Sequence, residues 1–339
     1  YHLDGLRLDA TQTIRDDSPL HILAEIQERV QSLATELGRR VCVIAETDEN
    51  DRRYVLPQAE GGYGVDAVWS DDFHHAMHAC LTGEREGYYQ DFGAREQIVK
   101  ALNQGFVYQG EPFRFWNGRN RGTPAANIPL PAHVICTQNH DQVGNRARGE
   151  RLDALVPRGA CKLIAALLLL APQTPLLFMG QEYGETAPFQ FFTDYGDPVL
   201  QNAVREGRRR EFEHFVAFGG EVPDPQDPRT FERSRIQLPA ATGQWPVSAG
   251  KQSNREDMLE WYRKLLKLRR EVVIPGDRTC RAELAGGAIV LQAPAREPKL
   301  RIVAEFPGSS HQDPNQSPEW RETLASDEDG YRVRIFRRW

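Results

Sequence analysis

The chain has 339 residues, with 42 Lys and Arg against 48 Asp and Glu, and a formal net charge of −6. This balance, without a basic stripe interleaved with aromatic residues, argues against nucleic acid as a partner. The longest apolar run, Leu163–Ala171, is far shorter than the ~20 residues of a membrane-spanning helix, so no membrane partner is expected. Five cysteines without CxxC spacing favour a reducing compartment, and we expect a cytoplasmic location.

The first half of the chain alternates between short apolar strands and amphipathic helices. We predict five strands, at Leu3–Asp9, Val41–Glu46, Val65–Trp69, Ala132–Thr137 and Pro175–Met179. Helices are predicted between them, at Pro19–Leu37, Asp72–Leu81, Arg95–Asn103 and Leu152–Leu170. This alternation predicts a parallel sheet. The long polar insertions follow strands rather than helices, which favours a (β/α) barrel with its site at the carboxyl ends of the strands.

The second half of the chain changes character. Residues 188–251 are predicted to be rich in loops, and Glu256–Arg270 is predicted to be an amphipathic helix. Short alternating runs then predict a small antiparallel β domain, at Ala288–Gln292, Leu300–Glu305 and Tyr331–Phe336. We therefore predict the fold class α/β, the C-terminal part of a (β/α)8 TIM barrel (about strands 4 to 8, residues 1–272) followed by a β domain at 273–339. An upstream barrel half of the same protein is expected.

Carboxylates stand at the ends of the predicted strands. Asp9 ends the first strand, Glu46 ends the second, and Asp141 follows the fourth. Two carboxylates facing a cleft are what glycoside hydrolysis needs, one as nucleophile and one as acid, about 5–5.5 Å apart in retaining enzymes. Arg7 points to the same face of its strand as Asp9 and could keep that carboxylate charged. The alternative is that Asp9 and Glu46 only cap the helices that follow them.

Three segments around these acids carry a family resemblance. GLRLDA (Gly5–Ala10), VIAETD (Val43–Asp48) and QNHDQVGNR (Gln138–Arg146) resemble strand-end segments of the α-amylase family of glycoside hydrolases, in that family's order. The resemblance implies that Asp9 is the nucleophile, that Glu46 is the general acid/base, and that Asp141 stabilises the transition state. It also implies sugar contacts for Arg7 and His140, and no cofactor.

Further segments resemble the trehalose-releasing hydrolases of that family: Val68–His78, Leu176–Glu185, Pro188–Pro198, Arg205–Phe212 and Pro223–Ile236. This implies an α-glucan substrate, maltooligosyl trehalose, cut at the α-1,4 bond next to its terminal trehalose. An α-glucan transglycosylase or a branching enzyme of the same family remains an alternative. Another alternative is a non-catalytic fragment with only a carbohydrate-binding surface, because the family's first three strands are not in this sequence.

The stretch after the third strand, DDFHHAMH, is predicted to contribute sugar contacts. Asp72, His74 and His75 are the candidates for hydrogen bonds to sugar hydroxyls. Capping of the helix by Asp71 or Asp72 is the alternative for the acids. A metal site from histidines four residues apart is disfavoured, because no further cluster of ligands accompanies them.

Aromatic residues gather after the fifth strand. Tyr183, Phe189 and Phe191 are predicted to stack on the faces of a glucan. A satellite hydrophobic cluster under a long loop is the alternative.

Overall fold

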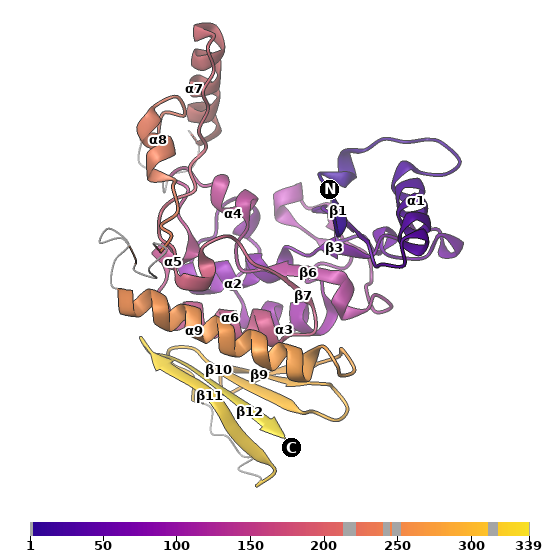
Figure 1. Ribbon diagram of the computed structural model, residues 1–339, viewed down its shortest axis with the longest axis vertical. Helices are drawn as coiled ribbons and strands as arrows, with labels where there is room; N and C mark the ends of the chain where they lie inside the picture. The colour runs from indigo at the N-terminus through magenta and orange to yellow at the C-terminus, as the bar shows by residue number, and fades with distance from the viewer. Residues whose placement is uncertain (1–2, 213–221, 240–244, 246–251, 311–317, 339) are drawn as a thin grey trace.

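The computed structural model describes residues 3–212, 222–239, 245, 252–310 and 318–338. It contains a parallel sheet and an antiparallel sheet, with helices packed between them (Figure 1). The parallel sheet has five strands, which lie side by side in the order in which they occur in the chain: β1 (Gly5–Leu8), β2 (Cys42–Ala45), β3 (Ala67–Trp69), β6 (His133–Cys136) and β7 (Thr174–Leu176). Parallel strands in chain order, joined by helices, are the arrangement of a barrel wall.

Successive side chains of a strand point in opposite directions, and the central strands β3 and β6 are buried at every residue, so both faces of the sheet are covered there. One face carries a small cluster formed by Ala67, Trp69 and Val134, with Ile44 and Leu176 against it. The opposite face packs on helix α1 (Ile22–Glu36) through a second cluster: Leu23, Val43, Ala45 and Val68 among others. The first face is the one that continues to the strand-end acids, since Ile44 precedes Glu46 by two residues.

The predicted helix Leu152–Leu170 is wrong as one element. The structure has two helices there, α5 (Leu152–Leu155) and α6 (Arg158–Leu170). Val156 between them is extended, with φ −128° and ψ 157°, because the residue before a proline avoids helical geometry. Pro157 then stands at the N-terminus of α6, where its missing N–H costs nothing.

Other helix boundaries agree with the sequence pattern or differ at one end. The helices α2 (Asp72–Thr82) and α3 (Arg95–Gln104) match the predictions closely. Helix α1 begins three residues later than predicted, because His21 caps it by accepting from Leu23 N at 3.2 Å. The stretch predicted as loop from 188 onward contains α7 (Pro198–Phe212) and α8 (Pro228–Arg233), which stand at the opposite end of the molecule from the C-terminal sheet (Figure 1).

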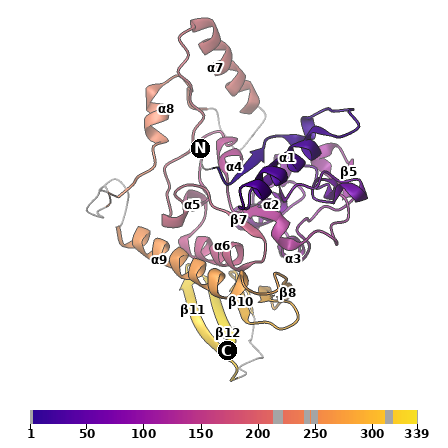
Figure 2. The same ribbon diagram turned by 45° about the vertical axis from the view of Figure 1, so that its right-hand side comes forward.

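The C-terminal sheet is antiparallel and has five strands in the order β11 (Trp320–Glu328), β12 (Tyr331–Arg338), β10 (Leu300–Glu305), β9 (Ala288–Ala293) and β8 (Arg281–Ala285). Both views show α9 (Gln252–Leu268) lying across this sheet, beneath the rest of the molecule (Figures 1 and 2). One buried cluster joins the two parts, with Leu163 of α6, Leu265 of α9 and Ile302 of β10 in it. No helix in the described ranges has the length and hydrophobicity needed to cross a membrane.

Candidate active site

The first two acids lie side by side because their strands pair in register. Leu8 pairs with Ala45, so the next residues, Asp9 and Glu46, leave the sheet together. Ala10 takes the left-handed conformation, with φ 44° and ψ 45°. Its N–H donates to Oε2 of Glu46 at 2.5 Å. A left-handed alanine costs about 1–2 kcal/mol, and here this backbone turn brings the amide after Asp9 against the Glu46 carboxylate.

Arg7 is the centre of the acid cluster. Its Nη1 donates to Asp9, and its Nη2 lies 3.7 Å from Oε2 of Glu46 and 3.8 Å from Oδ2 of Asp141. The guanidinium also lies over the ring of Trp69, 4.2 Å from the ring centroid. Three strand-end carboxylates are thus gathered around one cation, as the sequence predicted for Arg7 and Asp9 but not for the whole group.

The two acids of the predicted catalytic pair have different surroundings. The Asp9 side chain is 76% exposed and paired with Arg7, whereas the Glu46 side chain is 15% exposed. Burial raises the pKa of Glu46, the neighbouring carboxylates of Asp141 and Asp9 raise it further, and the Ala10 amide and Arg7 oppose the rise. A carboxyl whose pKa is raised by burial, next to an exposed carboxylate paired with a cation, has the unlike surroundings that acid-assisted substitution needs.

Asp141 reaches the cluster from the short helix α4 (His140–Gly144). Asn139 caps this helix, since its Oδ1 accepts from Gln142 N at 2.8 Å. His140 lies beside Asp141, with Nε2 and Oδ1 3.4 Å apart, and its ring centroid is 6.1 Å from that of Trp69. Both side chains are about half exposed, so both are available to a ligand in the cleft.

Asp72 and His74 do not face this cleft. Asp72 is fully buried and accepts from Arg121 Nη1 at 2.7 Å and from two backbone amides. His74 is 1% exposed, with its ring nitrogens 2.6 Å from Thr137 O and 2.9 Å from the Tyr89 hydroxyl. Burial lowers the pKa of His74 to about 3. The structure contradicts the predicted sugar contacts of these two side chains, because each is already satisfied inside the fold.

His75 is also buried, but its Nδ1 has no hydrogen-bond partner in the described part of the chain. Its ring packs on Tyr88, with centroids 4.7 Å apart. Among the described residues, no three or more His, Cys, Asp or Glu side chains are grouped so that they could hold a metal ion.

The three aromatic residues predicted to stack on a glucan pack against different neighbours in the structure. Tyr183 is 5% exposed and packs under Trp245 and Arg255, so stacking of this ring on a glucan is contradicted by its burial. Phe189 packs edge-on against Phe178, at 5.3 Å. Phe191 is 45% exposed, with the Arg208 guanidinium 5.3 Å from its centroid. Sugar contact by Phe189 and Phe191 stays a prediction.

A cavity of about 740 Å³ lies between the end of α2 and the stretch of chain that follows α4. Asn145 and Arg146, which follow Asp141 closely, line one wall, and Tyr88 and Phe115 line others. Glu84 stands in it, held by Arg146 through two bonds of 2.8 and 2.9 Å. Burial opposes ionisation of Glu84, but hydrogen bonds from His78 and Arg146 outweigh it and lower its pKa to about 2. The cavity therefore offers aromatic faces and charged groups, which suit a sugar.

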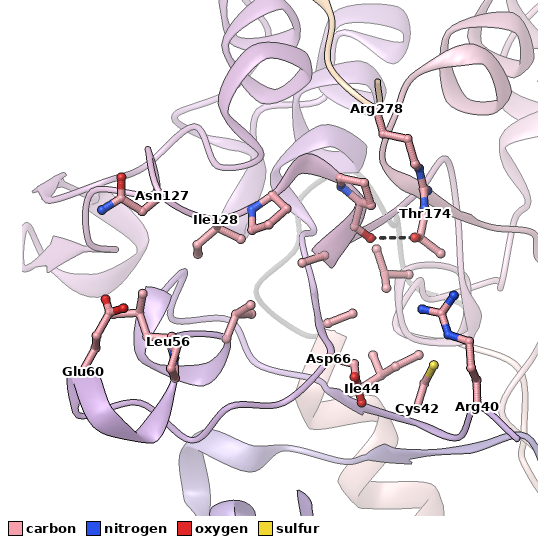
Figure 3. Close-up of a pocket in the computed structure, with 17 residues that line it drawn as sticks. Arg40, Cys42, Ile44, Leu56, Glu60, Asp66, Asn127, Ile128, Thr174 and Arg278 are labelled. Atoms are coloured by element: carbon pink, nitrogen blue, oxygen red, sulfur yellow. Dashed lines mark hydrogen bonds between the residues drawn. The ribbon is translucent and has the colours of Figure 1, made fainter. Parts of the chain in front are cut away.

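A second cavity, of about 730 Å³, lies at the other end of the strands (Figure 3). Ile44, Asp66 and Thr174 line it, with Arg40 and Arg278 at one side. The Asp66 carboxylate is occupied there, since it accepts from Val43 N at 2.8 Å. Barrel enzymes carry their sites at the carboxyl ends of the strands, so we place the functional site at the acid cluster instead.

Sequence reasoning missed two side chains at the cluster, Trp69 and Asp71. Trp69 shares the face of β3 that starts at Ala67, because alternate residues of a strand point the same way. Asp71 follows the end of β3, is half-buried, and its side chain does not cap α2. Alternation from Ala67 to Trp69 was the available signal for Trp69, and the position after a strand end was the signal for Asp71.

Comparisons with known proteins agree with this geometry. No family model matches the chain. Curated homologues at 38–45% identity are all named malto-oligosyltrehalose trehalohydrolase. One, from Rhizobium sp. (strain M-11), is 45% identical over 272 residues, 80% of this chain and 44% of its own length. Another, from Arthrobacter ramosus, is 44% identical over 91% of this chain and 52% of its own length. The chain spans about half the length of the curated relatives it matches.

Solved structures support the fold. A putative α-amylase from Salmonella typhimurium is 34% identical, with a TM-score of 0.83, over 99% of this chain and 57% of that protein. An α-amylase from H. orenii, at 14% identity and a TM-score of 0.53, shares the fold over 99% of this chain and 61% of its own. The predicted fold class, part of a (β/α)8 barrel followed by a small antiparallel β domain, is confirmed.

Proposed function

We propose that this chain, a homologue of the malto-oligosyltrehalose trehalohydrolases over about half their length, carries the catalytic acids of a retaining glycoside hydrolase. Its substrate would be maltooligosyl trehalose, cut at the α-1,4 bond next to the terminal trehalose. The observation that carries the proposal is the gathering of Asp9, Glu46 and Asp141 around the single guanidinium of Arg7. A retaining glycosidase needs two such carboxyls in unlike surroundings.

The proposed reaction is a double displacement. Glu46, whose pKa is raised by burial, gives its proton to the glycosidic oxygen while a carboxylate oxygen of Asp9 attacks the anomeric carbon. The C–O bond to the leaving sugar breaks and a glycosyl ester on Asp9 forms. Glu46, now charged, takes a proton from water, and the resulting hydroxide displaces Asp9 with net retention. Asp141 and His140 lie beside Arg7 and Trp69, where they can contact the sugar ring.

The 740 Å³ cavity is the proposed binding place for part of the substrate, because aromatic and charged side chains line it and two of its lining residues, Asn145 and Arg146, come four and five residues after Asp141. Residues 1–272 would form the catalytic part and 273–339 the β domain. This division is supported by the helical stretch that ends at Val273 and by β8, which starts at Arg281. We also keep the cytoplasm as the proposed location, which cell fractionation with an antibody would test.

The test uses the complete protein as expressed from its gene. Incubated with maltooligosyl trehalose, it should release free trehalose and a shortened maltooligosaccharide, which chromatography separates. Asp9→Asn and Glu46→Gln should each lower kcat about 10²–10⁴-fold, whereas Glu28→Gln, on the exposed side of α1, should leave it unchanged. Near-normal hydrolysis by either acid variant would overturn the catalytic assignment. Longer transfer products without trehalose would move the enzyme to the transglycosylase or branching-enzyme alternative.

A further inference from the structure

Asp71 is a cleft carboxyl that the proposed reaction does not use. It stands two residues after the end of β3, at the same edge of the parallel sheet where Asp9 and Glu46 follow β1 and β2, and Trp69 at the end of β3 lies under the Arg7 guanidinium. Asp71 occupies the N-terminal position of α2 without capping it, and within the described ranges its carboxylate takes part in no hydrogen bond. A half-buried carboxyl in this condition has its hydrogen-bonding capacity free for a ligand.

The surroundings of Asp71 connect the acids to the cavity. Burial raises its pKa to about 7, Arg121 opposes the rise, and the carboxylates of Glu46, Asp72 and Asp141 add to it. The pKa of the Tyr88 hydroxyl is raised by burial, and the Asp71 carboxylate raises it further. Asp71 therefore lies within electrostatic reach of both the predicted acid/base and a ring that lines the 740 Å³ cavity.

His75, one turn further along α2, contacts both Asp71 and Tyr88. His75 N donates to Asp71 O at 2.8 Å, so the two residues share a face of the helix. The His75 ring packs on Tyr88, and its buried Nδ1 has no partner in the described part of the chain. Among the residues that the structure describes, a ring nitrogen without a partner thus lies one helical turn from a carboxyl without one, and such groups can bind a polar ligand.

The strand order tells which sugar would meet Asp71. β2, with Glu46, lies between β1, with Asp9, and β3, with Asp71. When the anomeric carbon is at Asp9 and the leaving oxygen is at Glu46, the leaving sugar extends onward in the direction of Asp71.

We propose that Asp71 hydrogen-bonds a hydroxyl of the leaving sugar, beyond Glu46 from Asp9, and so determines which glucan ends are accepted. The proposal rests on the proposed hydrolase function and deepens it. Asp71 would touch substrate without taking part in bond exchange. The role that the sequence gave to Asp72 thereby passes to its neighbour, because Asp72 is committed to Arg121.

The test compares two leaving groups in the complete protein. One substrate is maltooligosyl trehalose, and the other is a p-nitrophenyl α-maltooligoside, whose nitrophenyl leaving group has no sugar hydroxyls. Asp71→Ala should lower kcat/KM for maltooligosyl trehalose about 10–100-fold, the effect of losing a hydrogen bond to a charged group. For the nitrophenyl substrate kcat/KM should change less than about threefold. Asp71→Asn, which keeps an acceptor oxygen at the same place without the charge, should recover part of the loss.

The controls separate the possible outcomes. Activity on the nitrophenyl substrate reports that the variant is folded, and Glu28→Gln gives the effect of an acid removed elsewhere. An equal fall in kcat/KM for both substrates would mean that Asp71 acts through Glu46 or through the stability of the fold. An unchanged kcat/KM for both would mean that Asp71 does not contact the substrate. Either result overturns the proposal while the hydrolase function stands. If the wild-type protein hydrolyses neither substrate, the proposed function and this proposal both fail.

Discussion

Replacing Asp72 with alanine is expected to destabilise the protein without touching the cleft. The carboxylate is fully buried and accepts four hydrogen bonds, from Arg121 at 2.7 Å, Asn50 at 2.8 Å, Val107 N at 2.7 Å and Tyr108 N at 3.0 Å. Arg121 is itself only 2% exposed, so the substitution leaves a buried cation without its ion-pair partner. Breaking a buried ion pair from one side costs about 3–5 kcal/mol, and we expect that loss in the free energy of unfolding.

Urea unfolding followed by tryptophan fluorescence measures this loss. The matched control is Glu28→Ala on the exposed side of α1, which should change the free energy of unfolding by less than about 0.5 kcal/mol. Folded Asp72→Ala should keep its kcat and KM at a temperature well below its unfolding transition. A change in stability below about 1 kcal/mol, together with a large rise in KM, would refute this reasoning and restore Asp72 as a sugar contact.

Three more predictions follow from single contacts. The pKa of Glu84 is about 2, because its ion pairs outweigh its burial. The stability of the wild-type protein should therefore fall as the pH drops from ~4.5 to 2. Glu84→Gln should lose this dependence, which an acid titration followed by circular dichroism measures. Arg269 donates to three main-chain carbonyls at 2.7–2.8 Å, so Arg269→Met should cost about 2–4 kcal/mol in urea unfolding, and an unchanged midpoint would contradict this. Arg7 lowers the pKa of Glu46, so Arg7→Met should move the basic limb of the kcat/KM profile to higher pH; a move to lower pH would contradict the acid assignment.

Much of the barrel part could be predicted from local pattern. The strands β2, β3 and β6 are continuous apolar runs, which only a sheet covered on both faces can bury. The acids stand where such runs end, and register then brings Asp9 and Glu46 together. The convergence of three carboxylates on Arg7 could not be predicted in the same way, because it depends on side-chain reach across β1, β2 and the loop before α4.

Two strands of the C-terminal sheet that the sequence did not predict, β8 and β11, are its edge strands. Edge strands carry many polar side chains, which keep them from pairing with other chains. In β11, with the sequence WRETLASDE, most side chains are exposed, so the apolar alternation that marks a strand is nearly absent. β11 is held as a strand by its pairing with β12, and this pairing is a tertiary contact that the local sequence pattern does not show.

The adjacent acids Asp71 and Asp72 show most clearly where sequence reasoning stops. Both stand at the junction of a strand, with side-chain period 2, and a helix, with period 3.6. The sequence pattern therefore does not decide which of the two side chains points into the cleft. The structure decides at Ser70, whose N–H still donates to Val134 O at 2.8 Å as if the strand continued. The helix begins immediately afterwards: Asp71 already has helical backbone angles, φ −71° and ψ −15°, and lies within electrostatic reach of Glu46 and Asp141, while Asp72 turns into the core towards Arg121. Asp71→Ala should therefore change substrate discrimination, whereas Asp72→Ala should change stability.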